Sequence, residues 1–341
     1  MPVMRLILAF TFATLNLLAA PNPLGLRPQP WQRREQPILS ARTTEEPWCK
    51  VVLYSPHVIH AKGKFHMWYV GTSTASRSPD KKFGYATSDD GINWQAYENN
   101  PILTGEDIPY GDHLQTPFVI FDDGSFKMWF VVVPGPDHGK QILGYATSMD
   151  GTRWQVHPEP IASSARGPVI IKEGPDNYRM WANSDPGPDK PGNIFSNIFE
   201  FTSKDGIRWT RKPKPAIIPT GRLKSCVYPW VSRLGHQYYI WYGGHIDGGM
   251  FELVCAESAD GTHWNTHDVR AAFPARDGKT HFDSRYTSTP CVLQHDGKLF
   301  LYYSARDWNR EYLGADGKKR RDGSSPYSHI GVAVLKLPEN H

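Results

Sequence analysis

The sequence predicts an all-β fold: a five-bladed β-propeller with four antiparallel strands in each blade. Three observations predict it. A Ser-x-Asp-Gly-x-x-Trp signature recurs four times, a short apolar segment that begins with proline recurs five times, and an aromatic segment follows each proline. Repeats at a regular spacing are the sequence signature of solenoids, propellers and arrays.

The proline segments predict the first strand of each blade. The prolines lie 61, 51, 61 and 61 residues apart, at Pro56, Pro117, Pro168, Pro229 and Pro290. The aromatic segments that follow predict the second strands, at 65–70, 126–131, 178–182, 238–242 and 299–303. Aromatic and β-branched residues favour strands, so each pair indicates a hairpin.

The Ser-x-Asp-Gly-x-x-Trp signature predicts the turn from the third to the fourth strand. It ends at Trp94, Trp154, Trp209 and Trp264, which are 60, 55 and 55 residues apart. Asp-Gly suits the positive φ angles of a hairpin turn, and the tryptophan offers a large packing surface. We therefore predict that these motifs build the scaffold and take no part in chemistry.

The two ends of the chain are predicted to meet. The fifth repeat has a third strand at about 330–335, and the chain then ends without a fourth. Residues 31–39 echo residues 94–103 of the first repeat, so we predict that they form the outer strand of the last blade. That pairing would close the ring and hide a sheet edge. The alternative is an open or a six-bladed arrangement.

Composition and the N-terminus limit where the protein works. The first 20 residues are predicted to be a signal peptide, with Arg5, an apolar core at 6–18 and a cleavage point at Ala19-Ala20. We expect residues 21–341 to form one secreted or periplasmic domain, with an uncleaved anchor as the alternative. The net charge of +4 demands neither nucleic acid nor a membrane as a partner. We expect a monomer.

The sequence predicts no zinc site and no required cofactor. The four cysteines, Cys49, Cys226, Cys255 and Cys291, show no Cys-x-x-Cys spacing, and four cysteines allow three disulfide pairings. Cys255 and Cys291 fall inside expected strands, where buried free thiols are common.

The five-fold pattern resembles an uncharacterised branch of the propeller glycosidases of glycoside hydrolase families 43, 32, 62, 117 and 130. The resemblance covers roughly residues 31–337 and is clearest in the phrases 64–71 and 83–88. It implies an enzyme that cleaves glycosidic bonds. In families 43 and 32, catalytic carboxylates commonly stand just before such a proline. Here those positions hold other residues: Ser55, Thr116, Gly167, Tyr228 and Thr289.

The catalytic carboxyls are therefore expected on the long loops that enter the first strands. Short turns join the first two strands, so the long connections share the opposite face, where binding and catalysis concentrate. Glycoside hydrolysis usually needs two carboxyls. We single out Asp112, Asp283 and Glu46, although each can equally be an ordinary loop residue.

Substrate contacts are expected around the same face. Sugar rings stack on aromatic side chains, and basic groups read hydroxyls or a uronate. His57 follows Pro56, and the resemblance to family 43 implies a possible calcium or sodium ion near it. The candidates are His57, His113, Trp48, Arg166, Tyr228, Trp230, His245, Arg285 and Asp307. For most of them a place in the core, on the surface or in an ion pair is the competing interpretation.

The sequence thus favours an exported glycoside hydrolase that acts on a poly- or oligosaccharide. A glycan-binding propeller without catalysis is the alternative, favoured by the missing acids beside the prolines. A phosphorolytic enzyme is a third hypothesis, and the signal peptide argues against it.

Overall fold

The computed structural model describes residues 23–74, 80–134, 141–185, 196–246, 251–266, 271–314, 316–323 and 326–338. The predicted signal peptide lies outside the described residues. Strands dominate, and the helices described are short 3₁₀ turns: η1 (Pro23–Gly25), η2 (Pro47–Cys49) and η3 (Gly105–Asp107). In the described part of the chain, no helix has the length and apolar character needed to cross a membrane.

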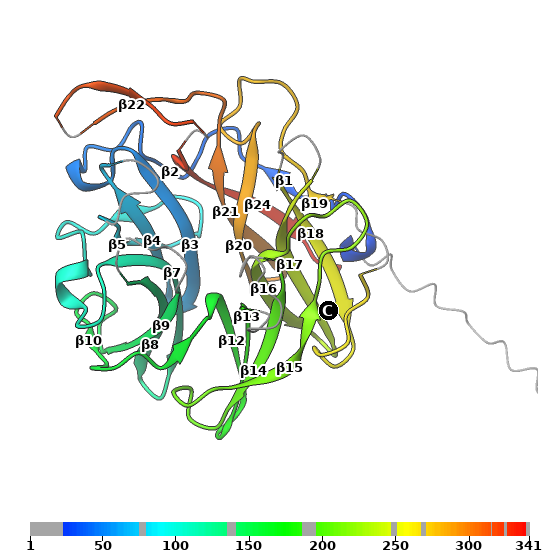
Figure 1. Ribbon diagram of the computed structural model, residues 1–341. Coiled ribbons are helices and arrows are strands. Elements are labelled where there is room, and N and C mark those ends of the chain that lie inside the picture. The colour runs from blue at the N-terminus through cyan, green and yellow to red at the C-terminus, as the bar shows by residue number, and fades with distance from the viewer. Residues whose placement is uncertain are drawn as a thin grey trace, which may run out of the picture.

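Antiparallel four-strand units follow one another along the chain (Figure 1). The first sheet contains β3 (Val52–Ala61), β4 (Lys64–Thr72), β5 (Lys82–Ser88) and β6 (Gln95–Ala96). The second contains β7 (His113–Asp122), β8 (Ser125–Val133), β9 (Ile142–Ser148) and β10 (Gln155–Val156), with β11 (Ala162–Ser163) also on β9. The third contains β12 (Arg166–Gly174), β13 (Asn177–Asn183), β14 (Ile198–Ser203) and β15 (Thr210–Ile217).

The remaining large sheet joins two further units. One holds β16 (Val227–Leu234), β17 (Gln237–His245), β18 (Phe251–Ser258) and β19 (Ala271–Phe273). The other holds β20 (Tyr286–His295), β21 (Lys298–Arg306), β24 (His329–Lys336), β1 (Gln32–Arg33) and β2 (Leu39–Ser40). A single parallel pair, Phe251 with Tyr286, connects the two units. The hairpin of β22 (Glu311–Leu313) and β23 (Lys319–Arg321) stands apart.

The N-terminal segment pairs with the last strand, which confirms the pairing predicted from the echo of residues 94–103. Gln32 lies opposite Val334, and Leu39 lies opposite Ile330, both in antiparallel register. The pairing is made by two short strands rather than one, because the chain leaves the ladder between β1 and β2.

The Asp-Gly turns are built as the sequence predicted. In each turn, the aspartate accepts hydrogen bonds from the backbone N–H groups two and three residues later, at 2.8–2.9 Å. The serine hydroxyl accepts from the glycine N–H, and each of these glycines has a φ between 71° and 83°. The motif thus satisfies its own backbone groups, which fits a structural role.

Donors from the second strands connect neighbouring sheets at these turns. The links are Trp68 to Gly151 O (2.9 Å), Trp129 to Gly206 O (2.7 Å), Trp181 to Gly261 O (3.0 Å) and Tyr302 to Gly91 O (2.9 Å). Trp241 of β17 instead donates to the Gln29 side chain at 3.0 Å, just before β1. Each link joins one sheet to the next, and the Tyr302 link joins the last sheet to the first. All five donor side chains are fully buried.

Each first strand is distorted at its proline. The residue before the proline has a positive φ in all five strands: Ser55 (54°), Thr116 (41°), Gly167 (58°), Tyr228 (54°) and Thr289 (45°). The strand register shifts at the same point in each. A left-handed conformation costs a non-glycine residue about 1–2 kcal/mol, and such strain clusters at functional sites. Figure 1 shows these strands, β3, β7, β12, β16 and β20, arranged around the middle of the view.

All four cysteines are free and buried. Burial raises the pKa of the Cys226 and Cys255 thiols to about 12, so both stay protonated at neutral pH. Cys255 in β18 and Cys291 in β20 are buried free thiols inside strands, as the sequence predicted for these two.

Candidate functional site

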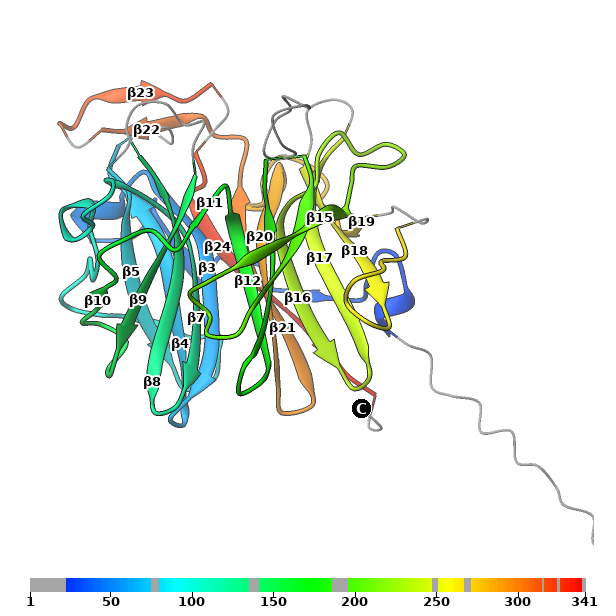
Figure 2. The ribbon, with the colours of Figure 1, turned by 60° about the horizontal axis from the view of Figure 1, so that its bottom comes forward.

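The long connections lie at one end of the sheets and the tight turns at the other (Figure 2). The β22–β23 hairpin stands at the long-loop end, while the turns of the β7–β8 and β20–β21 hairpins lie at the opposite end. The first strands therefore begin at the long-loop end, and we call their starting region the mouth. This arrangement agrees with the face predicted to carry the site.

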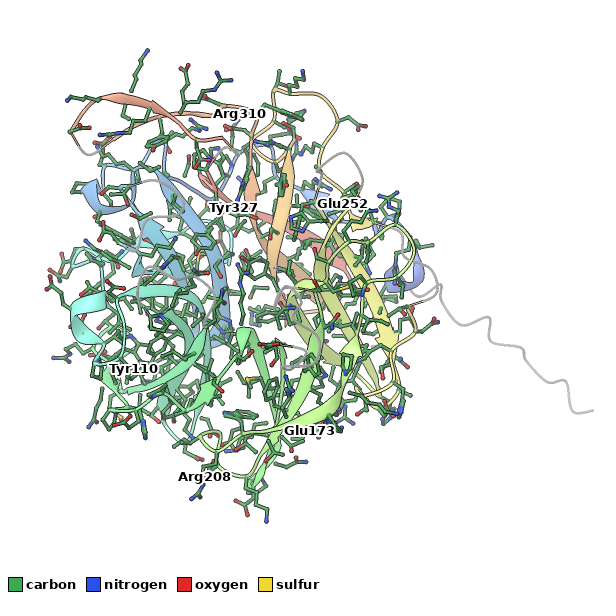
Figure 3. The ribbon with its side chains drawn as sticks, in the orientation of Figure 1. Tyr110, Glu173, Arg208, Glu252, Arg310 and Tyr327 are labelled. Carbon is green, nitrogen blue, oxygen red and sulfur yellow. The ribbon has the colours of Figure 1, made fainter. Side chains whose placement is uncertain are left out.

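A cluster of phenols and guanidiniums occupies the mouth. This mouth cluster consists of Tyr54, Arg166, Tyr228, Arg306 and Tyr327. Arg166 donates to the Tyr228 hydroxyl and lies 4.6 Å from the centre of its ring. Arg306 lies 3.7 Å from the ring centre of Tyr327, which stacks on Tyr54 at 5.5 Å. Tyr327 lies near the middle of Figure 3, with Tyr110 and Glu252 to either side.

Burial sets the protonation of the mouth cluster. It raises the pKa of both Tyr54 and Tyr228; Tyr228 adds to the rise at Tyr54 and Tyr327 to the rise at Tyr228, while Arg166 opposes the effect on both. Both phenols therefore remain neutral near pH 7. Neutral hydroxyls can both donate and accept hydrogen bonds, as sugar hydroxyls require of their partners.

Lys81 extends the cluster toward the start of β7. Its ammonium lies 2.7 Å from His113 Nε2, and the Gln115 side chain lies 3.1 Å from the same nitrogen. Lys81 and His113 are both buried. Burial, and next the positive charge of Arg166, lower the pKa of Lys81 to about 7. The Lys81 ammonium can therefore lose its proton near neutral pH.

Four of the predicted substrate-binding residues come together here: Arg166, Tyr228, His113 and His245. His245 is hydrogen-bonded to Ser225 at 2.6 Å. Its pKa is lowered by burial and then by the charges of Arg306 and Arg166, which places it in the same electrostatic environment. Arg285 joins from the side, because Tyr286 lies 5.7 Å from its guanidinium and 5.1 Å from that of Arg306.

His57 and Trp230 line the axial cavity instead. This cavity of about 30 Å³ is walled by the five prolines and their neighbours. His57 donates from Nε2 to the Val119 carbonyl at 2.7 Å, and its ring lies 5.3 Å from that of Trp230. Burial lowers the pKa of His57 to about 3, so it is neutral. Ligand pockets usually measure about 300–1,000 Å³, so a sugar would stay outside this cavity.

Trp48 and Glu46 are part of the scaffold of the first sheet. Trp48 is 8% exposed and stacks on Tyr69 at 5.9 Å. A Cβ at Gly71 would lie 2.4 Å from the Trp48 ring, so the chain packs closely there. Glu46 is half-buried and precedes the η2 turn, where its carbonyl accepts from the Cys49 N–H. The Trp48 ring is thus covered by protein and offers little surface for a sugar.

Asp283 is enclosed by an ion cluster. It has no exposed surface, and its carboxylate lies 3.2 Å from Arg33, 3.1 Å from Arg276 and 2.9 Å from the Tyr303 hydroxyl. Arg33 also stacks on Phe273 at 3.6 Å. These surroundings explain the carboxylate as a structural anchor of the N-terminal strand, and they leave no room for a substrate.

Asp307 belongs to a chain of polar groups at the rim. Arg42 contacts one of its carboxylate oxygens at 2.9 Å, and His329 contacts the other at 3.2 Å. His329 is bonded in turn to Ser40 at 3.0 Å. These partners hold the pKa of Asp307 below its usual range, although burial opposes them. An ion pair was one competing interpretation of the sequence candidates, and Asp307 forms one with Arg42.

Asp112 is the exposed carboxylate among the three predicted catalytic residues. It precedes His113 directly, at the entry to β7. Its backbone packs against Gly105 of η3, which fixes the loop while the side chain remains open to solvent.

Sequence reasoning missed Tyr54, Lys81, Arg306 and Tyr327. Tyr54 and Arg166 both stand two positions before a proline of a first strand, so the repeat register could have found Tyr54. Lys81 and Tyr327 come from loops between second and third strands, where the repeat gives no register. Within the described residues, no group of three or more His, Cys, Asp or Glu side chains has the arrangement of a metal site.

Known proteins share this architecture. Residues 30–197 match the model of the glycosyl hydrolases family 32 N-terminal domain. A glycosyl hydrolase from Bacteroides ovatus superposes with a TM-score of 0.65 at 17% identity, covering 90% of this chain and 93% of that one. The catalytic domain of the Coprinopsis cinerea GH62 α-L-arabinofuranosidase gives 0.61 at 12% identity, with 92% and 98% covered.

A structure from the GH130 family superposes with a TM-score of 0.63. That family of mannoside phosphorylases is described as containing glycoside hydrolases that target β-1,2 mannosidic linkages in Candida mannan. The structure is 16% identical and covers 90% of this chain and 93% of that one. The chain is thus similar to the propeller glycosidases in sequence over residues 30–197 and in fold over about nine tenths of its length. The predicted resemblance is thereby confirmed, and because one fold can host unrelated functions, the activity has to be argued from the site.

The curated relatives leave the activity open. An uncharacterised protein of Mycobacterium tuberculosis (strain ATCC 25618 / H37Rv) is 27% identical over 196 residues, 54% of this chain and 63% of that relative. The β-1,2-mannobiose phosphorylase of Thermoanaerobacter sp. (strain X514) is 27% identical over 148 residues, 40% of this chain and 48% of its own length. The chain thus matches less than two thirds of the length of these relatives.

Proposed function

We propose that the protein is an exported enzyme that cleaves glycosidic bonds in a poly- or oligosaccharide at the mouth of a closed, five-bladed propeller. The observation that carries the proposal is the mouth cluster, which gathers neutral phenols and guanidiniums at the end of the sheets where Asp112, an exposed carboxylate, precedes β7. Phenols and guanidiniums suit sugar hydroxyls and ring faces, and the carboxylate supplies an acid.

Ring closure is supported by the links between sheets. Four second-strand donors reach the turn glycine of the next sheet, and Tyr302 among them links the last sheet back to the first. Trp241 makes the equivalent bond to the N-terminal segment through Gln29. Five such links connect the units in one closed series. In a closed ring of this kind, the mouth would lie around the central axis.

Asp112 is the carboxyl that we propose as general acid. Protonation of a leaving oxygen requires a group that meets the substrate, and Asp112 is exposed while Asp283 is enclosed. The neighbouring Lys81–His113 pair would hold the loop and can accept a proton near neutral pH. A sodium or calcium ion near the axis stays a proposal, with His57 contributing at most Nδ1, because its Nε2 donates to Val119.

A second candidate function is phosphorolysis. It is favoured by Lys81, Arg166 and Arg306 at the mouth, since cations clamp phosphate, and by a relative named as a β-1,2-mannobiose phosphorylase. Phosphate would then act as the nucleophile, so one carboxyl would suffice. The signal peptide predicted at residues 1–20 supports hydrolysis instead, because export removes an enzyme from cytoplasmic phosphate.

The test is sugar release from plant, algal and microbial polysaccharides and aryl glycosides, with and without inorganic phosphate. We expect release by the protein and a loss of about 100-fold or more in Asp112→Asn, the size of a general acid's contribution. Asp89→Asn, which alters an exposed carboxylate on the turn face, is the matched control and should keep full turnover.

Each outcome separates the hypotheses. A sugar 1-phosphate that forms only with phosphate would establish phosphorolysis. Binding of a glycan with no release of product by the unaltered protein would refute the enzymatic proposal and support a glycan-binding propeller. Equal turnover in Asp112→Asn and Asp89→Asn would remove Asp112 from the mechanism.

A further inference from the structure

Cations and aromatic rings alternate along the mouth on the side of the last sheet. The ladder consists of Lys279, Trp308, Arg285, Tyr286, Arg306 and Tyr327, in that spatial order. The successive cation-to-ring distances are 5.5, 5.4, 5.7, 5.1 and 3.7 Å. Tyr54 continues the ladder beneath Tyr327, so it ends beside the axial cavity.

The ladder is assembled from three separate stretches of chain. Lys279 and Arg285 come from the loop before β20, Trp308 and Arg306 from the end of β21, and Tyr327 from the segment before β24. Such an assembly comes from the tertiary fold, because no repeat spacing in the sequence produces it. Its members are half-buried or exposed and therefore present part of their surface at the mouth.

Like charges are held close together along the ladder. Arg285 feels the positive charges of Arg310 and Arg306, which together with burial lower its pKa, and Asp322 offsets them only in part. Arg306 in turn lowers the pKa of His245. Crowded cations cost free energy in the free protein, and a bound anion recovers it.

We propose that the ladder is an extended binding track for a glycan that carries anionic groups on successive sugars, either uronate carboxylates or sulfate esters. A cation recurs after each ring and is held there by the ring on which it stacks, so a repeating anion matches the row of cations. Guanidinium groups bind carboxylate and sulfate oxygens through paired hydrogen bonds. The Trp308 indole N–H, which has no acceptor among the described residues, offers one more donor.

This inference rests on the proposed function, because it names the substrate class of the same mouth. The track leads from the rim at Lys279 to the axial end at Tyr54, beside Arg166 and Tyr228. A chain bound along it would present one sugar to the mouth cluster and extend its remaining acidic sugars over the last sheet.

The experiment is calorimetric titration of the full protein with four probes of similar length: an oligogalacturonate, a sulfated galactan oligosaccharide, a neutral mannan oligosaccharide and single-stranded DNA. We expect the two acidic glycans to bind at least about tenfold more tightly than the neutral one, and Arg285→Gln to remove about tenfold, the worth of one charged hydrogen bond. The tighter of the two acidic probes identifies the anion.

Arg233→Gln is the matched control. Arg233 also stands over a tyrosine, Tyr238 at 5.4 Å, but it lies at the turn end of β16, away from the mouth. Its loss should leave binding unchanged. Trp308→Ala should weaken the binding of both acidic glycans. Circular dichroism of each variant will show that the fold is retained.

Three results would overturn the proposal: equal binding of the neutral glycan, equal effects of Arg285→Gln and Arg233→Gln, or DNA binding as tight as that of the acidic glycans. Failure here is distinct from failure of the proposed function. If the protein cleaves neutral glycans and Arg285→Gln has no effect on binding, only the proposed binding track is refuted. If acidic glycans bind tightly but are not cleaved, only the proposed enzymatic activity is refuted.

Discussion

The two ends of the sheets differ in how far they keep the repeat. At the turn end, four turns share the same residues and the same hydrogen bonds, with aspartate and serine acceptors at nearly identical distances. At the mouth, the five positions before the prolines share a positive φ but hold different side chains: Ser, Thr, Gly, Tyr and Thr. The backbone conformation repeats at both ends of the sheets, whereas the side chains repeat only at the turn end.

The difference separates scaffold from site. The turn aspartates are stabilised by donors of their own turns, which lower the pKa of Asp90 and of Asp205 to about 2. At the mouth, side chains interact across sheets, as Arg166 of β12 does with Tyr228 of β16 and Tyr54 of β3 with Tyr327. Changes at the turn end should therefore cost stability, and changes at the mouth should cost binding.

The largest expected effect tests the turn end. Trp129→Ala should lower the free energy of unfolding by about 3–5 kcal/mol, because the indole is fully buried and joins the second sheet to Gly206. Trp129→Phe should cost about 1 kcal/mol, the worth of the lost hydrogen bond. Urea denaturation followed by circular dichroism measures both.

The mouth provides the contrast. Trp308→Phe should change the free energy of unfolding by less than about 0.5 kcal/mol, since that ring is only half-buried. Equal losses for Trp129→Phe and Trp308→Phe would contradict the division between the two ends.

A second prediction concerns Asp283, which the sequence places among the catalytic candidates. Asp283→Asn should lower the free energy of unfolding by about 3–5 kcal/mol, because it leaves the half-buried Arg33 without its carboxylate partner and leaves Arg276 with Glu35 alone. Glu252→Gln, which breaks the more exposed pair with Arg222 at 2.8 Å, should cost less than about 1 kcal/mol. A stable Asp283→Asn protein without turnover would return Asp283 to the active site.

The smallest effect concerns His57, between the two ends. Its pKa is about 3 in the folded protein and 6.5 in the unfolded chain, so the unfolded chain takes up the proton first as the pH falls below 6.5. Folded stability should therefore fall between pH 6.5 and 3, by about 2 kcal/mol at pH 5 from this residue. His57→Gln keeps a donor for Val119 and should remove that part of the slope. An unchanged slope in denaturation at pH 7 and pH 5 would show that His57 is not the cause.

Much of the fold could be predicted, because a repeat exposes its own strands. The prolines, aromatic segments and Asp-Gly turns fall within the observed elements, and the N-terminal segment pairs with β24 as its echo of residues 94–103 predicted. The strain before each proline could not be predicted, since the residue before proline ordinarily avoids such conformations. It appears only when the strands are brought together.

The candidate site was predicted less completely. Arg166, Tyr228, His113 and His245 lie at the end of the sheets to which loop length assigned them, and their role in binding stays a prediction. Trp48 and Asp283 have the residue types of a sugar site, but packing against Tyr69 and against two arginines covers them. The type of a residue tells which chemical group is present, whereas its burial in the folded protein tells whether a substrate can reach that group.

By itself the sequence determined the repeat, the turn chemistry, the pairing of the two termini and the face that carries long loops, because each of these follows from local spacing. Only the tertiary structure decided which side chains meet at the mouth. Tyr327 and Lys81 come from loops that the repeat does not align. Tyr327 contacts Tyr54 between the last and first units, and Lys81 contacts His113 between the first two sheets, so both contacts depend on how the sheets approach one another. The sequence shows the candidate residues as equivalent. Their burial and the charges around them in the folded protein distinguish those that can form a site.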